Sequence, residues 1–259
     1  LADYSSLETT LPGAGDLGPS LSLNLGGDLG LWARVLGGLS HQADRDEAYG
    51  YDGWTVGLAA GVDYQVTDQW LLGLYSAWTH SDLSYDDPGD SSTVGDSYQI
   101  GVYSAYERDD WFVQATLAYG FGAWQSDRRV VLGSLEYAAE SDQFTSGINT
   151  SILAGMDFHV DELVITPVLG LEYAYTHAYG YSEHGAGPLN LTVDGVDRHS
   201  LRTLAGAELS YPIDISIENT PLTLTPTLKA QWVHEYLGGE EVSARFTDLG
   251  SFSVNSPEP

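Results

Sequence analysis

Three observations in the 259-residue sequence predict an all-β chain of long antiparallel strands. Large apolar residues alternate with small or polar ones at a period of two, most clearly over residues 53–78. The alternating segments run for roughly 9–15 residues, about twice the usual strand length of a soluble β-sandwich. Long polar connections alternate with tight turns along the chain. Together these features predict an antiparallel transmembrane β-barrel of the bacterial outer membrane.

The first clear strand shows the pattern. Trp54, Val56 and Leu58 fall on one face of residues 53–64, whereas Gly57 and Gly61 fall on the other. Comparable segments begin at Trp70, Trp111, Phe144, Ile165 and Leu222, and weaker ones begin near Leu31, Tyr98, Leu201 and Val242. The sequence therefore predicts about ten strands.

Aromatic residues tend to begin and end the apolar faces. In a strand tilted by about 40°, Trp70 and Trp78 would lie roughly 20 Å apart along the bilayer normal. That spacing is typical of the aromatic girdles that flank the apolar band of a membrane barrel. We expect a lipid-facing girdle that includes Trp54, Trp70, Trp78, Trp111, Tyr173 and Trp232.

The connections predict which end of the barrel is which. Long polar stretches at residues 40–52, 81–96, 125–142 and 176–199 alternate with shorter turns at 66–69, 107–110, 159–162 and 211–221. Outer-membrane barrels keep long loops outside the cell and short turns in the periplasm. We therefore expect the long stretches to be extracellular loops.

Composition excludes several classes of protein. The net charge of −28, from 9 Lys and Arg against 37 Asp and Glu, argues against a nucleic-acid partner. The chain has no cysteine, no zinc signature, no phosphate loop and no cofactor motif, so we expect no cofactor. No stretch approaches the roughly 20 apolar residues of a membrane helix. Because the first residues lack the features of a signal peptide, we expect a mature or excised piece of a longer protein.

The face opposite the girdle is expected to line a lumen. The alternation places eight ionisable residues there, Arg34, Asp63, Asp157, Glu172, Arg202, Glu208, Lys229 and Glu235. One interpretation is a charge network that holds the shape of the sheet around a wet interior. Another is that some of these residues grip a chain segment or set an ion preference.

Two other kinds of site could lie at the rim, the catalytic site of a hydrolase and a calcium site. A hydrolase there would need a nucleophile, a base and an orienting group to converge, and candidate histidines occur at 80, 177, 184 and 234, with Ser81, Asp82 and Glu235 beside them. No spacing in the sequence requires that convergence, so solvated histidines are the favoured interpretation. The acidic stretches "QADRDEAYGYD" and "YDDPGDSS" lack the spacing of a calcium loop, which favours solvated acidic loops over a metal site.

Two regions of the chain, one near its start and one near its end, resemble a known family. "LWARVLGGLSHQ" and "GYDGWTVGLAAGVDYQVTDQWLLGLYSAWTHSDLSY" resemble the opening of the autotransporter β-domain, the C-terminal translocator of type V secretion in Gram-negative bacteria. The residues that carry the resemblance are Trp32, Arg34, Gly61 and Asp63, and late in the chain Trp232, His234 and Glu235. "LTPTLKAQWVHEY" and "SARFTDLGSFSV" resemble the ninth and tenth strands of that family.

The resemblance implies a twelve-stranded barrel with both termini in the periplasm. It also implies a passenger domain exported in cis, a linker through the pore, insertion by the barrel-assembly machinery, and contact with outer-membrane lipid and lipopolysaccharide. We expect residues 1–27 to be a linker or plug and residues 28–259 to form the barrel. Pro12 and Pro19 favour an extended plug over a long helix. The final "NSPEP" is expected to be a periplasmic turn, about two strands short of the full barrel.

The sequence thus predicts a non-enzymatic translocator or anchor that exports or displays an N-terminal passenger. A stand-alone channel or porin is the main alternative, in which residues 1–27 would be an ordinary periplasmic tail. A hydrolase at the rim is the remote one.

Overall fold

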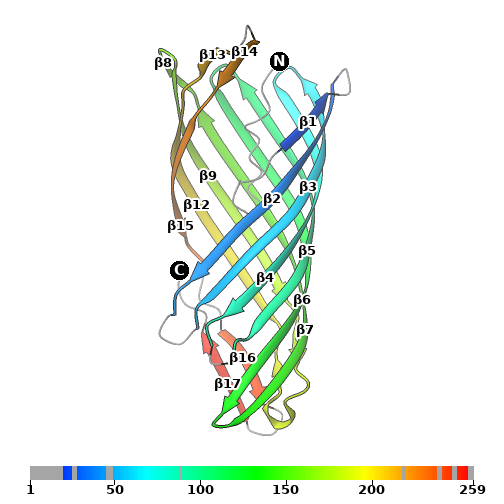
Figure 1. The fold of residues 1–259 in the computed structure, drawn as a ribbon. Coiled ribbons are helices and arrows are strands. Elements are labelled where there is room, and N and C mark those ends of the chain that lie inside the picture. Colours follow the sequence, from blue (N-terminus) through cyan, green and yellow to red (C-terminus); the bar gives the residue numbers. More distant parts are fainter. Residues whose placement is uncertain are drawn as a thin grey trace.

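The structure is a computed structural model that describes residues 20–24, 28–44, 49–87, 89–217, 220–237, 241–246 and 250–255. One antiparallel sheet contains most of this part of the chain, and its strands pair in the order β1-β2-β3-β4-β5-β6-β7-β9-β12-β15. Figure 1 shows this sheet curling about a long axis, with β2 and β15 toward its two edges. The prediction of an all-β antiparallel fold is confirmed. Within the described ranges, no helix has the length and apolar character needed to cross a membrane.

The strands of this sheet are long. Their bounds are β1 Ser20–Asn24, β2 Leu29–Gln42, β3 Tyr51–Thr67, β4 Trp70–Tyr85, β5 Ser92–Arg108, β6 Trp111–Leu132, β7 Leu135–Met156, β9 Leu163–Ala178, β12 Val196–Ser210 and β15 Thr227–Glu235. A short strand, β8 (Phe158–Val160), pairs with the start of β9.

The predicted loop at 125–142 is a strand hairpin in the structure. β6 and β7 each run for 22 residues and pair without a register shift from Trp111 and Met156 to Leu132 and Leu135. Gly133 has a φ of 65°, the left-handed backbone that tight hairpin turns require and that glycine adopts without strain. The polar composition of this stretch therefore did not indicate an irregular backbone.

The last segments differ from the sequence prediction. The segment near Val242 was expected to be a further barrel strand, but β16 (Glu241–Phe246) pairs with β11 (Leu191–Val193) and β17 (Gly250–Asn255). With β10 (Tyr181–Ser182) they make a four-stranded sheet at the end of the barrel where β6 and β7 meet (Figure 1). Asn255, the first residue of the "NSPEP" stretch expected as a turn at the opposite end, closes β17 in this sheet.

The segment that begins at Leu222 is also divided. β13 (Ile213–Ile217) and β14 (Thr220–Leu224) form a separate hairpin at the other end of the barrel, near β8 (Figure 1). The barrel strand β15 starts only at Thr227, after Pro226. A proline has no N–H to donate to a ladder, which accounts for the interruption.

The structure describes only residues 20–24 of the predicted N-terminal linker, residues 1–27. β1 pairs antiparallel with the first part of β2, from Ser20 with Arg34 to Asn24 with Gly30. Residues 1–19 and 25–27 of the expected linker, and residues 256–259 after β17, lie outside the described residues. The plug over residues 1–27 therefore stays a prediction.

The two faces of the barrel sheet differ as the alternation predicts. Leu58, Leu74 and Leu117 leave 56%, 47% and 52% of their surface exposed, whereas Leu71 and Tyr75 are buried. The buried side chains lie on the inner face of the curled sheet, which lines a cavity of about 350 Å³ walled by residues such as Leu71, Tyr103 and Gln114. Apolar surface therefore points outward along most of the barrel.

Aromatic rings cover glycines on the inner face. Trp32 lies directly across from Gly61 on the neighbouring strand, and four other pairs repeat the arrangement, Tyr103 with Gly73, Tyr75 with Gly101, Trp124 with Gly95 and Phe112 with Gly155. In all five pairs, a Cβ added at the glycine would overlap the facing ring. The small residues predicted to leave a lumen open therefore make room for large side chains from the next strand.

This interlock predicts a strong effect of a single methyl group at Gly73. Gly73→Ala would force the Tyr103 ring to move, so we expect the free energy of unfolding to fall by about 1–3 kcal/mol. Urea unfolding of the protein in lipid vesicles, followed by tryptophan fluorescence, measures the loss. Gly120→Ala on the same face is the control, because its new Cβ would lie 3.4 Å from the nearest atom, the Tyr98 carbonyl oxygen. Equal stability of the two variants would contradict the interlock.

Candidate functional sites on the inner face and the rim

Opposite charges lie directly across from one another on the inner face. Arg202 of β12 is in register with Glu172 of β9 and with Glu235 of β15. Glu208 of β12 is in register with Lys229 of β15. Cβ atoms of directly paired residues lie about 5 Å apart, close enough for opposite charges to stabilise the pairing. We call these two sets, which hold five of the eight predicted lumen residues, the charge rows.

Glu235 fastens the end of β15 to β12. Its carboxylate accepts hydrogen bonds from Arg202 Nε at 2.8 Å, from the Ser200 hydroxyl at 2.5 Å and from the backbone N–H of Leu201 at 2.8 Å. The Leu237 N–H donates a fourth at 3.2 Å, and only 14% of the Glu235 side chain is exposed. This carboxylate therefore has a structural role in the sheet in addition to its charge.

Asp63 belongs to an aromatic cluster. Trp32 Nε1 donates to the Tyr103 hydroxyl at 2.6 Å, and that hydroxyl donates to the Asp63 carboxylate. The Trp32 ring lies 6.3 Å from the Tyr103 ring and 6.4 Å from the Tyr75 ring, centroid to centroid. The sequence predicted Asp63 as a lumen charge but did not predict this cluster, because the partners come from three different strands.

The remaining predicted lumen residues lie on the same side of the sheet. Asp157 accepts a hydrogen bond from the Thr166 hydroxyl at 2.5 Å. Together with Glu172, Glu208 and Lys229 it lines the 350 Å³ cavity. Arg34 sits in β2, where its backbone pairs with Ala59 of β3 and Ser20 of β1. Their proposed actions on a chain segment or on ions stay predictions.

The predicted girdle residues lie on the opposite, outer side. Five tryptophans are exposed, Trp54, Trp70, Trp78, Trp111 and Trp232, at 40%, 42%, 36%, 39% and 62% of their surface. Two of their indole N–H groups are bonded within the sheet, Trp70 to the Ser104 hydroxyl at 2.7 Å and Trp78 to Asp96 at 3.0 Å. Tyr173 is partly buried, with its hydroxyl 2.9 Å from His199 Nδ1. That these residues form a girdle in lipid stays a prediction.

The rim residues that are neighbours in sequence separate in the structure. His80 pairs with Asp96 at 3.1 Å, whereas the Ser81 hydroxyl lies 2.8 Å from the Thr55 hydroxyl. His234 stacks on the outer Trp232 ring at 5.5 Å, while Glu235 is bonded to Arg202. Because successive residues of a strand point to opposite faces, His80 and Ser81 point away from each other, and so do His234 and Glu235.

A histidine cluster that the sequence did not predict lies across β9 and β12. The Asp197 carboxylate accepts from the Tyr175 hydroxyl at 2.7 Å and lies 2.7 Å from His177 Nδ1. His177 and Asp197 are paired in register, which only the strand alignment reveals.

The acidic loops use several carboxylates to support their own backbone. Asp44 accepts from the Gly50 N–H at 2.6 Å, and Asp87 accepts from the Ser91 N–H at 2.7 Å and the Ser91 hydroxyl at 2.6 Å. In the part of the chain that the structure describes, no three His, Asp or Glu side chains gather in a way that could hold a metal ion. Residues 45–48 and 88 of these loops lie outside that part.

A long antiparallel sheet with an outward apolar face and charge rows inside defines an outer-membrane barrel. The family model described as "Autotransporter beta-domain" matches residues 31–259, and the chain therefore belongs to the autotransporter β-domain family. The predicted family is confirmed, and with it the role of an outer-membrane translocator barrel. Membership implies a passenger domain in the same polypeptide.

Relatives and solved structures agree with this assignment. "Outer membrane protein A" of Rickettsia conorii is 31% identical over 246 residues, which cover 89% of this chain and 12% of the relative. "Extracellular serine protease" of Serratia marcescens is 30% identical over 237 residues, or 88% of this chain and 21% of the relative. The chain thus spans only a small part of these relatives.

Two solved translocators have the same fold. The translocator domain of the autotransporter NalP from Neisseria meningitidis superposes with a TM-score of 0.63 at 14% identity, covering 90% of this chain and 84% of that chain. The β-domain of the Bordetella autotransporter BrkA superposes with a TM-score of 0.57 at 19% identity, covering 88% and 91%. Both support the barrel.

The bonds of Glu235 predict a measurable loss on its removal. Glu235→Ala would leave Arg202 and two backbone N–H groups without this acceptor, so we expect unfolding to become easier by about 1–3 kcal/mol. Glu136→Ala is the matched control, because Glu136 is 62% exposed and lies 3.7 Å from Arg129. Surface pairs of that kind contribute about 0–1 kcal/mol. The same urea assay compares the two, and a larger loss in the control would refute the role of Glu235.

Proposed function

We propose that the barrel spans the outer membrane with its exposed apolar face against lipid and lipopolysaccharide. The end that carries the β6–β7 hairpin and the four-stranded sheet is extracellular, and the end where short turns join the strands is periplasmic. The expectation of a periplasmic C-terminal end is not part of this proposal, because β17 lies in the four-stranded sheet. The observation that carries this proposal is the outward exposure of Leu58, Leu74 and Leu117 over the middle of three strands. A water-soluble sheet would bury these side chains. The sizes of the connections support the orientation, since short turns join the strands at the other end.

We further propose that the barrel exports or displays a passenger that precedes it in the polypeptide. Residues 1–27 would pass along the lumen, where Asp3, Glu8 and Asp16 can pair with Arg34, Arg202 and Lys229. The pairing of β1 with β2 supports a path that begins at the first barrel strand. Insertion by the barrel-assembly machinery is part of the same proposal, and family membership supports it.

The chain itself is proposed to be non-enzymatic. The separation of His80 from Ser81, and of His234 from Glu235, on opposite faces supports this. The relatives called a serine protease and an esterase are much longer than this chain, which leaves ample room for their named activities outside the matched region.

A stand-alone porin remains the second candidate, and the interior argues against it. The rings of Trp32, Tyr75 and Tyr103 lie on the inner face and fill part of the inner space. A porin keeps a water-filled channel through its barrel.

The lipid-facing assignment predicts a penalty for a charge on the outer face. Leu74→Arg should cost roughly 2–4 kcal/mol near the middle of the bilayer. Display of the passenger on intact cells, measured with an antibody, should fall in step. Gln114→Arg is the control, because Gln114 lines the inner cavity. Gly73 is unsuitable as an inner control, since the Tyr103 ring covers it. An equal effect of both substitutions would refute the outward orientation.

The charge balance predicts cation preference. Of the eight residues predicted to line the lumen, five are acids, Asp63, Asp157, Glu172, Glu208 and Glu235, and three are bases, Arg34, Arg202 and Lys229. Carboxylates along a pore raise the local cation concentration and repel anions. The narrow lumen dominates, because salt screens the outer loops beyond about 8 Å. The reversal potential of the reconstituted protein across a KCl gradient measures the preference, and an anion-selective current would contradict it.

A further inference from the structure

The connection between β9 and β12, residues 179–195, is anchored on both sides. On one side it pairs with the β7 extension, where the Glu140 N–H donates to the His184 carbonyl at 2.8 Å and the His184 N–H donates back at 2.9 Å. On the other side β11 pairs with β16, and the Asp194 N–H donates to the Ser243 carbonyl at 3.1 Å. This connection is therefore an ordered element of the barrel end.

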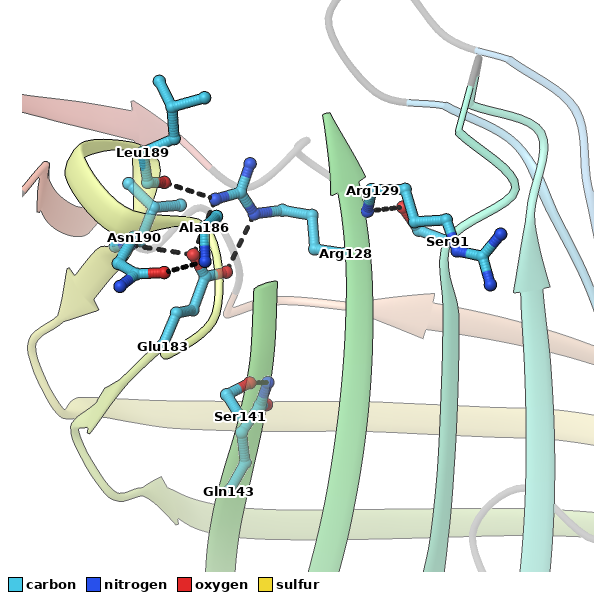
Figure 2. A network of polar contacts seen from close by, with 10 residues as sticks. Ser91, Arg128, Arg129, Ser141, Gln143, Glu183, Ala186, Leu189 and Asn190 are labelled. Atoms are coloured by element: carbon cyan, nitrogen blue, oxygen red, sulfur yellow. Dashed lines mark hydrogen bonds and ion pairs between the residues drawn. The ribbon is translucent and has the colours of Figure 1, made fainter. Parts of the chain in front are cut away.

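An ion pair between Arg128 and the buried Glu183 fixes it to β6. Arg128 donates from Nε to one Glu183 oxygen at 2.8 Å and from Nη2 to the other at 2.6 Å (Figure 2). The same Nη2 donates to the Leu189 carbonyl at 2.9 Å, and the Leu191 N–H donates to Glu183 at 2.8 Å. Only 4% of the Glu183 side chain is exposed. The hydrogen bonds that Arg128 donates to Glu183 raise the pKa of the Arg128 guanidinium above its ordinary value.

The direction of Arg128 shows where the connection lies. Phe112, Gln114 and Thr116 of β6 line the inner cavity, and β6 pairs with β7 without a bulge from there to Leu132. Arg128 is an even number of residues away and thus points to the same inner side. Residues 179–195 therefore fold over the inner side of the sheet, at the mouth of the barrel.

This end of the barrel also encloses a pocket. Arg128 and Glu183 line it together with Tyr85, Ser91 and Tyr181, and its volume is about 700 Å³. Gly180 and Gly195 lie against one another where the connection joins β9 and β12. Glycines at both bases give the backbone the freedom that a hinged segment needs.

We propose that residues 179–195 are a lid over the mouth of the lumen and that Arg128–Glu183 is its latch. The proposal rests on the proposed function in one respect, that this end faces outside the cell. Removing Arg128 would leave the Glu183 carboxylate buried without its counter-charge, so the latch favours one closed arrangement over partly open ones. Passage of a chain or of ions requires the latch to break.

The first test is protease access on intact cells that produce the full protein. Glu183→Gln should make chymotrypsin cleavage at the aromatic residues of the lid faster by about tenfold or more, since a charge-assisted bond is lost. Glu136→Gln is the control, because this exposed carboxylate lies in the β6–β7 hairpin, as Arg128 does, but takes no part in the latch. Equal rates in the wild type and both variants would overturn the latch.

Permeabilised cells separate the two proposals. Cleavage that needs permeabilised cells overturns the extracellular orientation and with it the place of the lid outside. The ratio of rates for the two variants then still decides whether Arg128–Glu183 restrains the segment.

The second test locks the lid. The chain has no cysteine, so Glu140→Cys with His184→Cys creates the one possible disulfide within it. Antiparallel residues that exchange both backbone hydrogen bonds have Cα atoms about 5.5 Å apart, within the range that a disulfide bridges. The oxidised protein should conduct less in planar bilayers than after reduction, and reduction should restore the wild-type current. Equal currents before and after reduction would overturn the lid.

Discussion

The backbone hydrogen-bond ladder from β2 to β15 is the constraint on which the rest of the structure depends. In hydrocarbon every N–H and C=O group needs a partner within the protein, and the ladder supplies it for the strands between the two edges of the sheet. β6 and β7 meet this requirement through 22 paired positions without a register shift. The ladder leaves each side chain only two directions. Every other feature of the barrel is a consequence of which residues are sent each way.

Because the outer face is apolar, specific packing has to come from the inside. The inner face packs aromatic rings onto glycines of the next strand, as Trp32 on Gly61 and Tyr103 on Gly73. A glycine within a strand costs conformational entropy. Here that cost is offset by the area that the ring buries and, for Tyr103, by hydrogen bonds to Trp32 and Asp63. The charge rows of β9, β12 and β15 continue the same principle with polar groups.

The alternation in the sequence was sufficient to predict which face a residue takes. It placed Leu58 and Leu74 on one face and Arg202 and Glu235 on the other. In the structure Leu58 and Leu74 are exposed, and Arg202 lies in register with Glu235. It was not sufficient to predict neighbours, because a period of two fixes a face and leaves the register open. The packing of aromatic rings on glycines of the next strand depends on register alone, and so does the His177–Asp197 pair.

The sequence also did not predict which alternating segments would lie outside the main sheet. The residues near Val242 alternate like a barrel strand, yet they pair with β11 at the mouth. Nothing in a local pattern distinguishes a strand that continues the barrel from one that folds back over its end. Pro226 is a local signal for one such interruption, because a residue without an N–H cannot donate to the ladder. It lies between β14 and β15.

The same geometry limits what chemistry a barrel wall can perform. Residues adjacent in sequence, such as His80 and Ser81, point to opposite faces. A catalytic or binding site on the wall must therefore be assembled from side chains of different strands or from the loops. The polar contacts of this protein follow that rule. Glu235 joins β15 to β12, Asp63 joins β3 to β5 and β2, and Glu183 joins the 179–195 connection to β6. Each of these carboxylates bridges elements that would have to separate if the barrel or its mouth opened. These three carboxylates therefore hold neighbouring elements together and keep the wall of the barrel in shape. A translocator needs such a wall, because its shape has to persist while a chain passes through.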